Sequence, residues 1–367
     1  MAARTGAPGD LACQLQPSLR MEETTETQTI EWLYRDHLQV DEEWSIRTAH
    51  GFRWWADRHA QQVEVIGEET GPDDVTAYVI SVRTEVLRGL ELTERNLAAI
   101  NALIMPFAAM AGPVYDEDAG TLSLASLVRV HEEIAGWMNP MIGVAAALQL
   151  AEARAAATDW ARELGAAEAV SGHPENGRRK TPDELVNVVP SVVIPSGRGP
   201  SLWKPAEFEE AVARHMQQPP SLMASAGGPG LTVEFPYGDM SSLCRMNADK
   251  RHPRYGNGLH VMQSFPLPGF GDTDGIRLAL EMNAAELAYR PFGYGFGSYT
   301  FGHGMLEFVG FFPNLVHKPG MLPNIYFSCA GRAHAMSARL MNAPWTPERF
   351  SRVGSAIERL FGTQGGE

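Results

Sequence analysis

The chain has 367 residues, of which 44% are hydrophobic and 20% charged, a composition typical of folded globular proteins and not of disordered or fibrous ones. This length is enough for two domains that each bury a core of their own. The formal net charge is −14, and Arg178-Arg179-Lys180 is the longest run of basic residues, so the charge argues against a nucleic-acid partner.

The N-terminal residues predict a disordered leader. Residues 1–28 are rich in Thr, Glu, Gly and Ala and contain no continuous apolar run, so they do not resemble a secretory signal. Met1 and Met21 are both suitable start residues. We therefore expect a cytoplasmic protein.

The first domain is predicted over residues 29–166. An apolar stripe in residues 28–39 predicts a short amphipathic helix. Residues 44–58, 61–68 and 75–87 alternate apolar and polar side chains or are dense in β-branched ones, which predicts three strands.

The same domain continues with a helix, two strands and a further helix. Thr93 is a suitable cap for a helix over residues 93–105, and a strand over 121–130 follows the turn DEDAG. Asn139 as cap and Pro140 at the first position predict a helix to about residue 157. The predicted order is α-β-β-β-α-β-β-α.

The uncharged stretch 97–114 has about the length of a membrane-spanning helix. It contains Asn101, Pro106 and Pro113, and its second half aligns with a strand in the other half of the chain. We interpret it as a buried helix followed by a strand, and we expect no membrane contact.

Residues 167–204 predict a linker because they carry five prolines and several glycines. Within them, residues 185–194 are apolar enough to pack against a domain or to add an edge strand. The second domain is predicted over residues 205–367. Its expected elements are a helix at 205–217, strands at 231–237, 242–247 and 259–265, a helix from 272, a hairpin of 296–301 with 305–312, a helix at 324–341 and a final helix at 347–361.

The two domains repeat one pattern at an offset of about 184 residues without a gap. The matched pairs are Tyr115 and Tyr299, Gly120 and Gly304, Leu122 and Leu306, Leu124 and Phe308, Val128 and Phe312, and the pair Asn139-Pro140 with Pro323-Asn324. A glycine turn, an apolar strand and a helix opened by Pro or Asn recur in the same order. This predicts two tandem copies of one α+β unit, each an antiparallel sheet with helices on one face, plus a C-terminal helix.

The predicted order resembles the small α+β fold of the YbjN proteins and of type III secretion chaperones of the CesT kind. Residues 114–153, VYDEDAGTLSLASLVRVHEEIAGWMNPMIGVAAALQLAEA, are similar to actinobacterial proteins described as YbjN-like peptide-binding chaperones. The resemblance covers about 120 residues in each copy. It implies binding of a peptide or partner protein without bond chemistry, and a homodimer or a pseudo-dimer within one chain.

Large rings are the candidate partner-binding residues. In a strand, Phe52 and Trp54 share one face while Trp55 points to the other, so rings lie on both sides of the sheet. Phe296, Phe308 and Phe312 hold comparable places in the second copy. A wide apolar surface is costly to expose, so the rings either form the core, cover one another between the copies, or line a groove for a partner.

Enzymatic chemistry is the alternative, near the Gly-rich hairpin 293–304. His303 and Glu307 would need hydrogen-bond contact to act as an acid-base pair, and His317 follows the next strand. The glycine spacing favours a strand with glycines facing rings, or a bulge at Ser298, over a phosphate loop. His131-Glu132-Glu133 lacks the second histidine of a zinc motif, and we expect it at a strand end.

Three isolated cysteines, Cys13, Cys244 and Cys329, predict neither a disulfide framework nor a zinc site, and they fit a reducing compartment. Cys329 is expected to be a small buried hydrophobe, with a reactive thiol as the alternative. We find no catalytic constellation and no cofactor motif. The sequence therefore favours a non-enzymatic, cytoplasmic peptide- or protein-binding protein, with an enzyme or a purely structural assembly module as alternatives.

Overall fold

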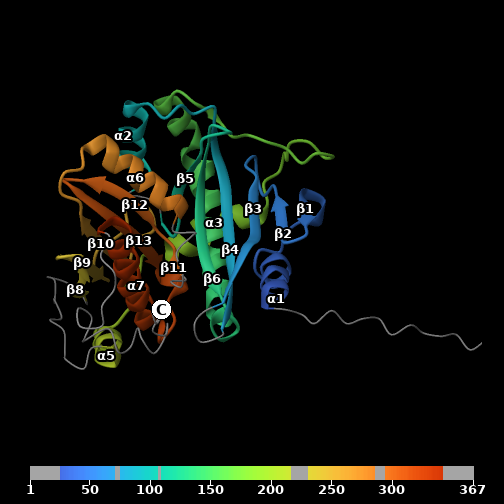
Figure 1. Ribbon diagram of the computed structural model, residues 1–367. Helices are drawn as coiled ribbons and strands as arrows, with labels where there is room; N and C mark the ends of the chain where they lie inside the picture. The colour runs from blue at the N-terminus through green and yellow to red at the C-terminus, as the bar shows by residue number, and fades with distance from the viewer. Residues whose placement is uncertain (1–24, 71–74, 106–108, 216–229, 286–293, 342–367) are drawn as a thin grey trace, which may run out of the picture.

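The computed structural model describes residues 25–70, 75–105, 109–215, 230–285 and 294–341 (Figure 1). The chain folds into two antiparallel sheets with helices packed against them, which confirms the predicted α+β class. Residues 25–28 of the predicted leader are helical, since the first helix starts at Thr25. The rest of that leader and the predicted helix 347–361 lie outside the described residues.

The first half contains most of the long elements. They are helix α1 (Thr25–Glu31), the π-helical turn η1 (Trp32–His37), the 3-10 turn η2 (Glu42–Trp44), strands β1 (Ser45–Thr48), β2 (Gly51–Trp54), β3 (Gln61–Thr70) and β4 (Thr76–Arg88), helix α2 (Glu94–Leu103), strands β5 (Gly112–Asp116) and β6 (Thr121–Val130), and helix α3 (Glu132–Leu164). The predicted strand 44–58 is thus the hairpin β1–β2.

Short elements connect this half to the second. They are β7 (Ala167–Glu168), the helical turns η4 (Glu184–Asn187) and η5 (Val189–Val193), and α4 (Ile194–Ser196). The second half has α5 (Pro205–His215), β8 (Gly230–Tyr237), β9 (Met240–Asn247), β10 (Gly258–Pro266), α6 (Asp272–Ala285), β11 (Tyr294–Gly295), β12 (Ser298–Gly302), β13 (Met305–Pro313), the 3-10 turn η7 (Asn314–Val316) and α7 (Met321–Met341).

The two sheets repeat one strand order. In the first, β2, β3, β4 and β6 are neighbours in that order and β5 pairs with β6; in the second, the order is β8, β9, β10, β13 and β12. All of these pairs are antiparallel. Helix α3 packs on β4 and β6, and α7 packs on β8 and β10. The chain therefore contains two tandem copies of one unit.

The structural alignment of the two copies needs a gap, whereas their sequences were aligned above without one. Leu122 pairs with Tyr115, whereas Leu306 pairs with Phe301, so Tyr115 corresponds to Phe301 and not to Tyr299. The cause is the hairpin turn, which has four residues in the first copy and two in the second. His303 and Gly304 form the shorter turn, both with positive φ (53° and 71°), as the twist of a tight hairpin requires.

Helix α3 begins earlier than predicted. His131 is its N-cap residue, and Glu132 and Glu133 occupy its first turn, where the helix dipole favours acidic side chains. The expectation that His131-Glu132-Glu133 ends a strand is wrong for the two glutamates. Pro140 lies inside the helix, so it does not open it. Thr93, by contrast, caps α2 as predicted, accepting from Asn96 N at 3.2 Å.

Helix α3 is also the one described helix long and apolar enough to cross a membrane. Its apolar stretch is 67% buried inside the protein, beneath the first sheet, so we assign it to the core. The uncharged stretch 97–114 contains the end of α2 and the start of β5, as predicted for a buried helix followed by a strand.

One segment joins the two sheets. Strand β11 pairs with β6, Tyr294 with Val128 and Gly295 with Leu127, and the chain then enters the second sheet as β12. A Cβ atom on Gly297 would lie 2.3 Å from the Phe308 ring, so this glycine faces a ring as expected. Residues 294–302 thus belong to both sheets.

Two asparagines cover the edge of β12. Asn283 of α6 accepts from Tyr299 N at 2.7 Å, within the second half. Asn101 of α2, in the first half, accepts from Phe301 N at 2.9 Å and donates to Phe301 O at 2.8 Å. The exposed backbone groups of an edge strand are thus satisfied by one amide from each half.

Candidate binding cleft

The six rings proposed to bind a partner are all in the core. Their exposed fractions are 0% for Phe52, Trp54 and Phe296, 2% for Phe312, and 3% for Trp55 and Phe308. None of them lies on a surface that a partner could contact. Other parts of the same chain cover these rings, so they occupy the core, one of the three places that the sequence left open for them.

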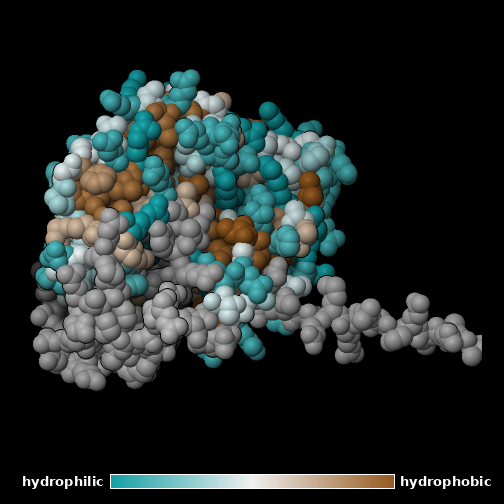
Figure 2. Space-filling model, viewed as in Figure 1, coloured by the Kyte–Doolittle hydropathy of each residue, from teal (hydrophilic) through white to brown (hydrophobic). Residues whose placement is uncertain are grey.

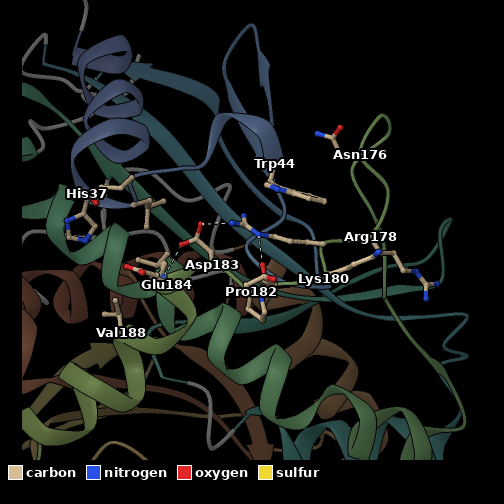
Figure 3. A pocket seen from close by; sticks show the side chains of 14 residues that line it. His37, Trp44, Asn176, Arg178, Lys180, Pro182, Asp183, Glu184 and Val188 are labelled. Atoms are coloured by element: carbon tan, nitrogen blue, oxygen red, sulfur yellow. Dashed lines mark hydrogen bonds and ion pairs between the residues drawn. The ribbon is translucent and has the colours of Figure 1, made fainter.

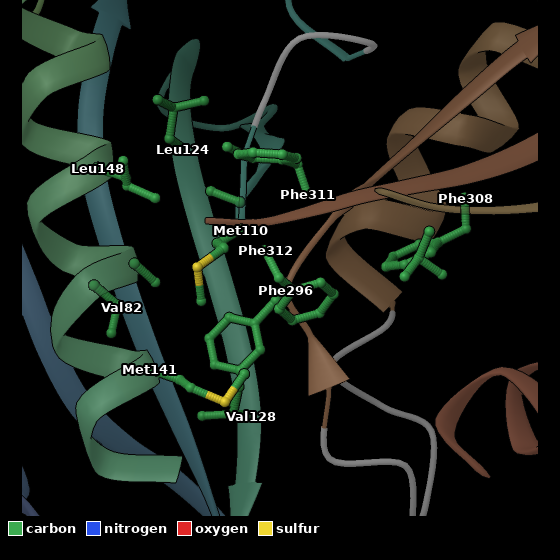
Figure 4. Close-up of a cluster of buried hydrophobic side chains, with 14 of the residues drawn as sticks. Val82, Met110, Leu124, Val128, Met141, Leu148, Phe296, Phe308, Phe311 and Phe312 are labelled. Atoms are coloured by element: carbon green, nitrogen blue, oxygen red, sulfur yellow. The ribbon is translucent and has the colours of Figure 1, made fainter. Parts of the chain in front are cut away.

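The cover differs between the rings. Trp54 Nε1 donates to Gln61 Oε1 at 3.1 Å inside the first half. On the other side of the sheet, Trp55 Nε1 donates to Ser171 Oγ at 3.0 Å, so the segment after α3 covers it. Phe296 and Phe312 meet edge to face at 6.3 Å and lie next to the first sheet (Figure 4). Rings of the second copy are thus covered in part by the first copy.

The surface seen in Figure 2 is mostly hydrophilic, with hydrophobic side chains over the strands of the first sheet and around α6 and β12. Val79, Ala125 and Leu127 form a small buried cluster on the first sheet, separate from the main core. Large hydrophobic side chains that are 37–46% exposed are Ile66, Val75, Leu103, Val192, Leu202, Phe270 and Leu315. None of them is one of the six predicted rings.

The residues suggested for enzymatic chemistry are not brought together. His303 is exposed at the tip of the β12–β13 turn, and Glu307 accepts from Ser264 Oγ at 3.3 Å. His317 instead pairs with Glu207, 3.0 Å from both carboxylate oxygens. Within the described residues, no hydrogen bond joins His303 to Glu307, so the geometry does not support an acid-base pair there.

A cleft of about 870 Å³ lies beside the first sheet (Figure 3). It is lined by the end of η1, by Trp44 and by the segment after the first domain. The lining residues are His37, Leu38, Gln39, Trp44, Asn176, Arg178, Arg179, Lys180, Thr181, Pro182, Asp183, Glu184, Leu185 and Val188. Its volume is in the range of ligand-binding pockets.

One wall of the cleft is strained. After η1 the chain turns sharply, with Leu38 N donating to Leu33 O and Val40 N to Tyr34 O, both at 2.9 Å. Between them Gln39 adopts φ of 45°, a left-handed conformation that is uncommon for residues other than glycine. Because such strain concentrates at binding sites, the exposed Gln39 marks this wall as a candidate contact.

The opposite wall is fixed by Arg179. Its guanidinium lies 3.0 Å from Asp41 and 3.2 Å from Asp183, and it donates to the Trp55 carbonyl oxygen at 3.1 Å. It also lies 5.4 Å from the Trp44 ring centre. Arg179 is therefore a structural cation that holds the segment 178–183 against the first domain.

The side chains on either side of Arg179 are available to bind a ligand. Arg178 and Lys180 are exposed, and within the described residues neither makes a hydrogen bond or an ion pair. Leu185 and Val188, both half-buried, add apolar surface to the same cleft. The cleft thus offers two unpaired cations beside apolar side chains and one indole ring, and the exposed Glu184 carboxylate lines it as well.

A further wall is the loop His173-Pro174-Glu175-Asn176-Gly177. His173 and Gly177 exchange two backbone hydrogen bonds at 2.8 Å, and His173 Nδ1 accepts from Glu175 N and Asn176 N at 3.3 and 3.2 Å. The His173 ring packs on Trp55 at 5.2 Å, and Asn176 Nδ2 donates to Glu43 O at 2.6 Å. This wall is held by an internal network and not by a regular element.

The same loop occurs in the second half as His252-Pro253-Arg254-Tyr255-Gly256. His252 and Gly256 exchange bonds at 2.8 and 3.0 Å, and His252 Nδ1 accepts from Arg254 N and Tyr255 N at 3.2 and 3.3 Å. Its Tyr255 hydroxyl donates to Glu152 of α3, so this copy binds the two halves together. The recurring His-Pro-x-x-Gly spacing is a sequence signal that the repeat comparison did not detect.

His37 closes one end of the cleft. Its ring stacks on Trp32 at 4.9 Å and fills the space beside Gly143, where a Cβ atom would lie 1.6 Å from the ring. Desolvation by burial lowers the pKa of His37. Its imidazole is therefore neutral at pH 7 and presents a hydrogen-bonding group without charge.

Comparisons by sequence and by structure match this chain to no protein-family model, no curated protein and no solved structure. Among the described residues, no group of three or more His, Cys, Asp or Glu side chains is arranged to hold a metal ion.

Proposed function

We propose that the protein is a non-enzymatic, cytoplasmic binding protein that holds an extended peptide segment of a partner protein in the cleft beside the first sheet. The observation that carries this proposal is the pairing of apolar side chains with the unpaired cations Arg178 and Lys180 in one cleft of about 870 Å³. The resemblance to peptide-binding chaperones points to the same class of function.

The chemistry of the cleft favours an acidic, partly apolar segment. Leu185 and Val188 are partly exposed and can bury apolar side chains of such a segment, and the Trp44 ring supplies a rigid surface. Two exposed cations on a chain of net charge −14 would attract carboxylates that the rest of the surface repels. This occupant replaces the sheet-face ligand expected from the sequence, because the rings of that face are buried.

Fluorescence anisotropy with a labelled peptide of alternating leucine and glutamate tests the proposal. We expect this peptide to bind, a leucine-lysine peptide not to bind, and added salt to weaken binding. The double variant R178E/K180E should lose about tenfold in affinity, as expected for two exposed ion pairs of up to about 1 kcal/mol each.

The matched control is R245E/K250E, which makes the same charge change at two exposed cations outside the cleft. Binding should survive it. Equal affinity of both double variants, or equal binding of the acidic and the basic peptide, would show that the cleft is not the binding site.

A further inference from the structure

Two thiols lie next to one another inside the second half. Cys244 is on β9 and Cys329 on α7, and each is 1% exposed. Gln263 lies beside both cysteines. It pairs with Cys244 across the β9/β10 ladder, and its Nε2 donates to the backbone oxygen of Cys329 at 2.8 Å. Neither cysteine is in a disulfide, and their side chains are in hydrogen-bond contact.

The two sulfur atoms have different surroundings. Arg332 is almost one helical turn beyond Cys329, and its guanidinium approaches Cys329 Sγ at 4.0 Å. The same cation lies 3.6 Å from the Phe308 ring centre and is 3% exposed, so packing fixes its position. A neighbouring cation stabilises a thiolate, and this favours the ionised form of Cys329.

Cys244 has the opposite preference. Its hydrogen bond to Cys329 and its burial raise the pKa of the Cys244 thiol, so it keeps its proton. A thiol that donates to a neighbouring sulfur further stabilises that sulfur as a thiolate. The pair is thus divided into one attacking sulfur and one protonated partner.

We propose that Cys244 and Cys329 form a redox-active dithiol that hydrogen peroxide converts into an internal disulfide between β9 and α7. Cys329 is the attacking thiol and Cys244 the resolving thiol. This assigns a modification site to the second half, independent of the binding cleft in the first. In a reducing compartment such a bond forms transiently, as redox-sensing disulfides do.

The reaction balances in two steps. The Cys329 thiolate attacks one peroxide oxygen, the O–O bond breaks, and Cys329 becomes a sulfenic acid while the other oxygen leaves as hydroxide and takes a proton to form water. The Cys244 sulfur then attacks the sulfenic sulfur, its proton passes to the leaving hydroxyl, and a second water is released. The dithiol loses two electrons, and peroxide gains them.

Intact-protein mass spectrometry of the full chain tests this assignment, in a C13S background so that only the pair can react. After dilute peroxide we expect a loss of two hydrogen atoms, reversed by dithiothreitol, and a peptide containing both Cys244 and Cys329. In C13S/C244S we expect a sulfenic acid at Cys329 that dimedone traps. In C13S/C329S we expect labelling of Cys244 to be about tenfold slower.

The C13S protein alone decides whether the disulfide forms, since both members of the pair are intact there. Failure to lose two hydrogen atoms at peroxide concentrations that already oxidise methionine would overturn the proposal. Equal dimedone labelling of the two single thiols would overturn the assignment of Cys329 as the attacking sulfur. R332Q should slow the oxidation and R332K should preserve most of it, because the charge at Cys329 is the stated cause.

Discussion

Single buried amides tie each sheet to its helix. In the first half, Gln61 Nε2 donates to Thr84 Oγ1 at 2.8 Å and to Ala146 O of α3 at 2.9 Å. In the second, Gln263 Nε2 donates to Ser242 Oγ at 3.1 Å and to Cys329 O of α7. The glutamine comes from a different strand in each copy, yet it makes the same link between sheet and helix.

Replacing Gln61 with leucine should destabilise the protein by about 2–3 kcal/mol, because it leaves the buried Trp54 N–H without its acceptor and removes two donated bonds. Urea unfolding measures the change. The control is Gln62→Leu, whose side chain is only half-buried and bonds Glu64. A loss below about 0.5 kcal/mol for Gln61→Leu would show that the link contributes little.

For single residues, the sequence predicts which face of a strand a side chain takes better than it predicts what that side chain contacts. Apolar alternation correctly marks Phe52 and Trp54 as facing one side of a sheet, but it cannot tell whether a neighbouring segment covers Trp55. That cover comes from Ser171 and His173, more than 100 residues away, through a hydrogen bond and a ring contact. Arg178 and Lys180 were visible as a basic run, whereas their place on a cleft depends on Arg179 pairing with Asp41.

Elements are held at their edges as well as on their faces. The outward backbone groups of β12 would be a template for pairing with another chain. Asn101 and Asn283 occupy them instead, and Asn101 does so across the boundary between the halves. A side-chain amide thus takes the place of a neighbouring strand.

Asn101→Ala should free the Phe301 N–H and C=O and raise the rate of amide exchange in residues 298–302, with a loss of about 1–2 kcal/mol in stability. Hydrogen-exchange mass spectrometry of that segment measures it. Asn187→Ala, at an exposed helical turn, is the control and should leave exchange unchanged. Unchanged protection of β12 in Asn101→Ala would mean that other contacts protect this edge.

At some element boundaries, tertiary packing overrides the local sequence preference. Asn139-Pro140 is a good helix start by local preference, yet α3 begins at Glu132, because its apolar residues pack along the first sheet and this outweighs the cost of an internal proline. Residues 185–194 allowed either a packed segment or an edge strand. They form helical turns that bury Val186, Val189 and Val193.

The whole molecule is two copies that share one continuous core. The main hydrophobic cluster includes side chains from both sheets and from α3 and α7. Strand β11 belongs to the edge of the first sheet and runs directly into β12 of the second. The predicted tandem duplication was readable from the strand and helix order, but this crossing was not, because it depends on two short pairings.

Gly295→Ala tests the coupling of the halves. A Cβ atom there would lie 2.0 Å from Leu127 O, so β11 must move away from β6. We expect the natural chain to unfold in a single transition and Gly295→Ala to split it, with circular dichroism and tryptophan fluorescence giving different midpoints for the variant. Gly302→Ala is the control, since no atom lies within 4 Å of its Cβ position. Coincident transitions in Gly295→Ala would show that β11 does not couple the halves.

The twin His-Pro-x-x-Gly loops restrict the chemistry of their own histidines. Nδ1 of His173 and of His252 each receives two amide protons, so each ring must carry its single hydrogen on Nε2. Each imidazole is thereby fixed in one tautomer by its own main chain.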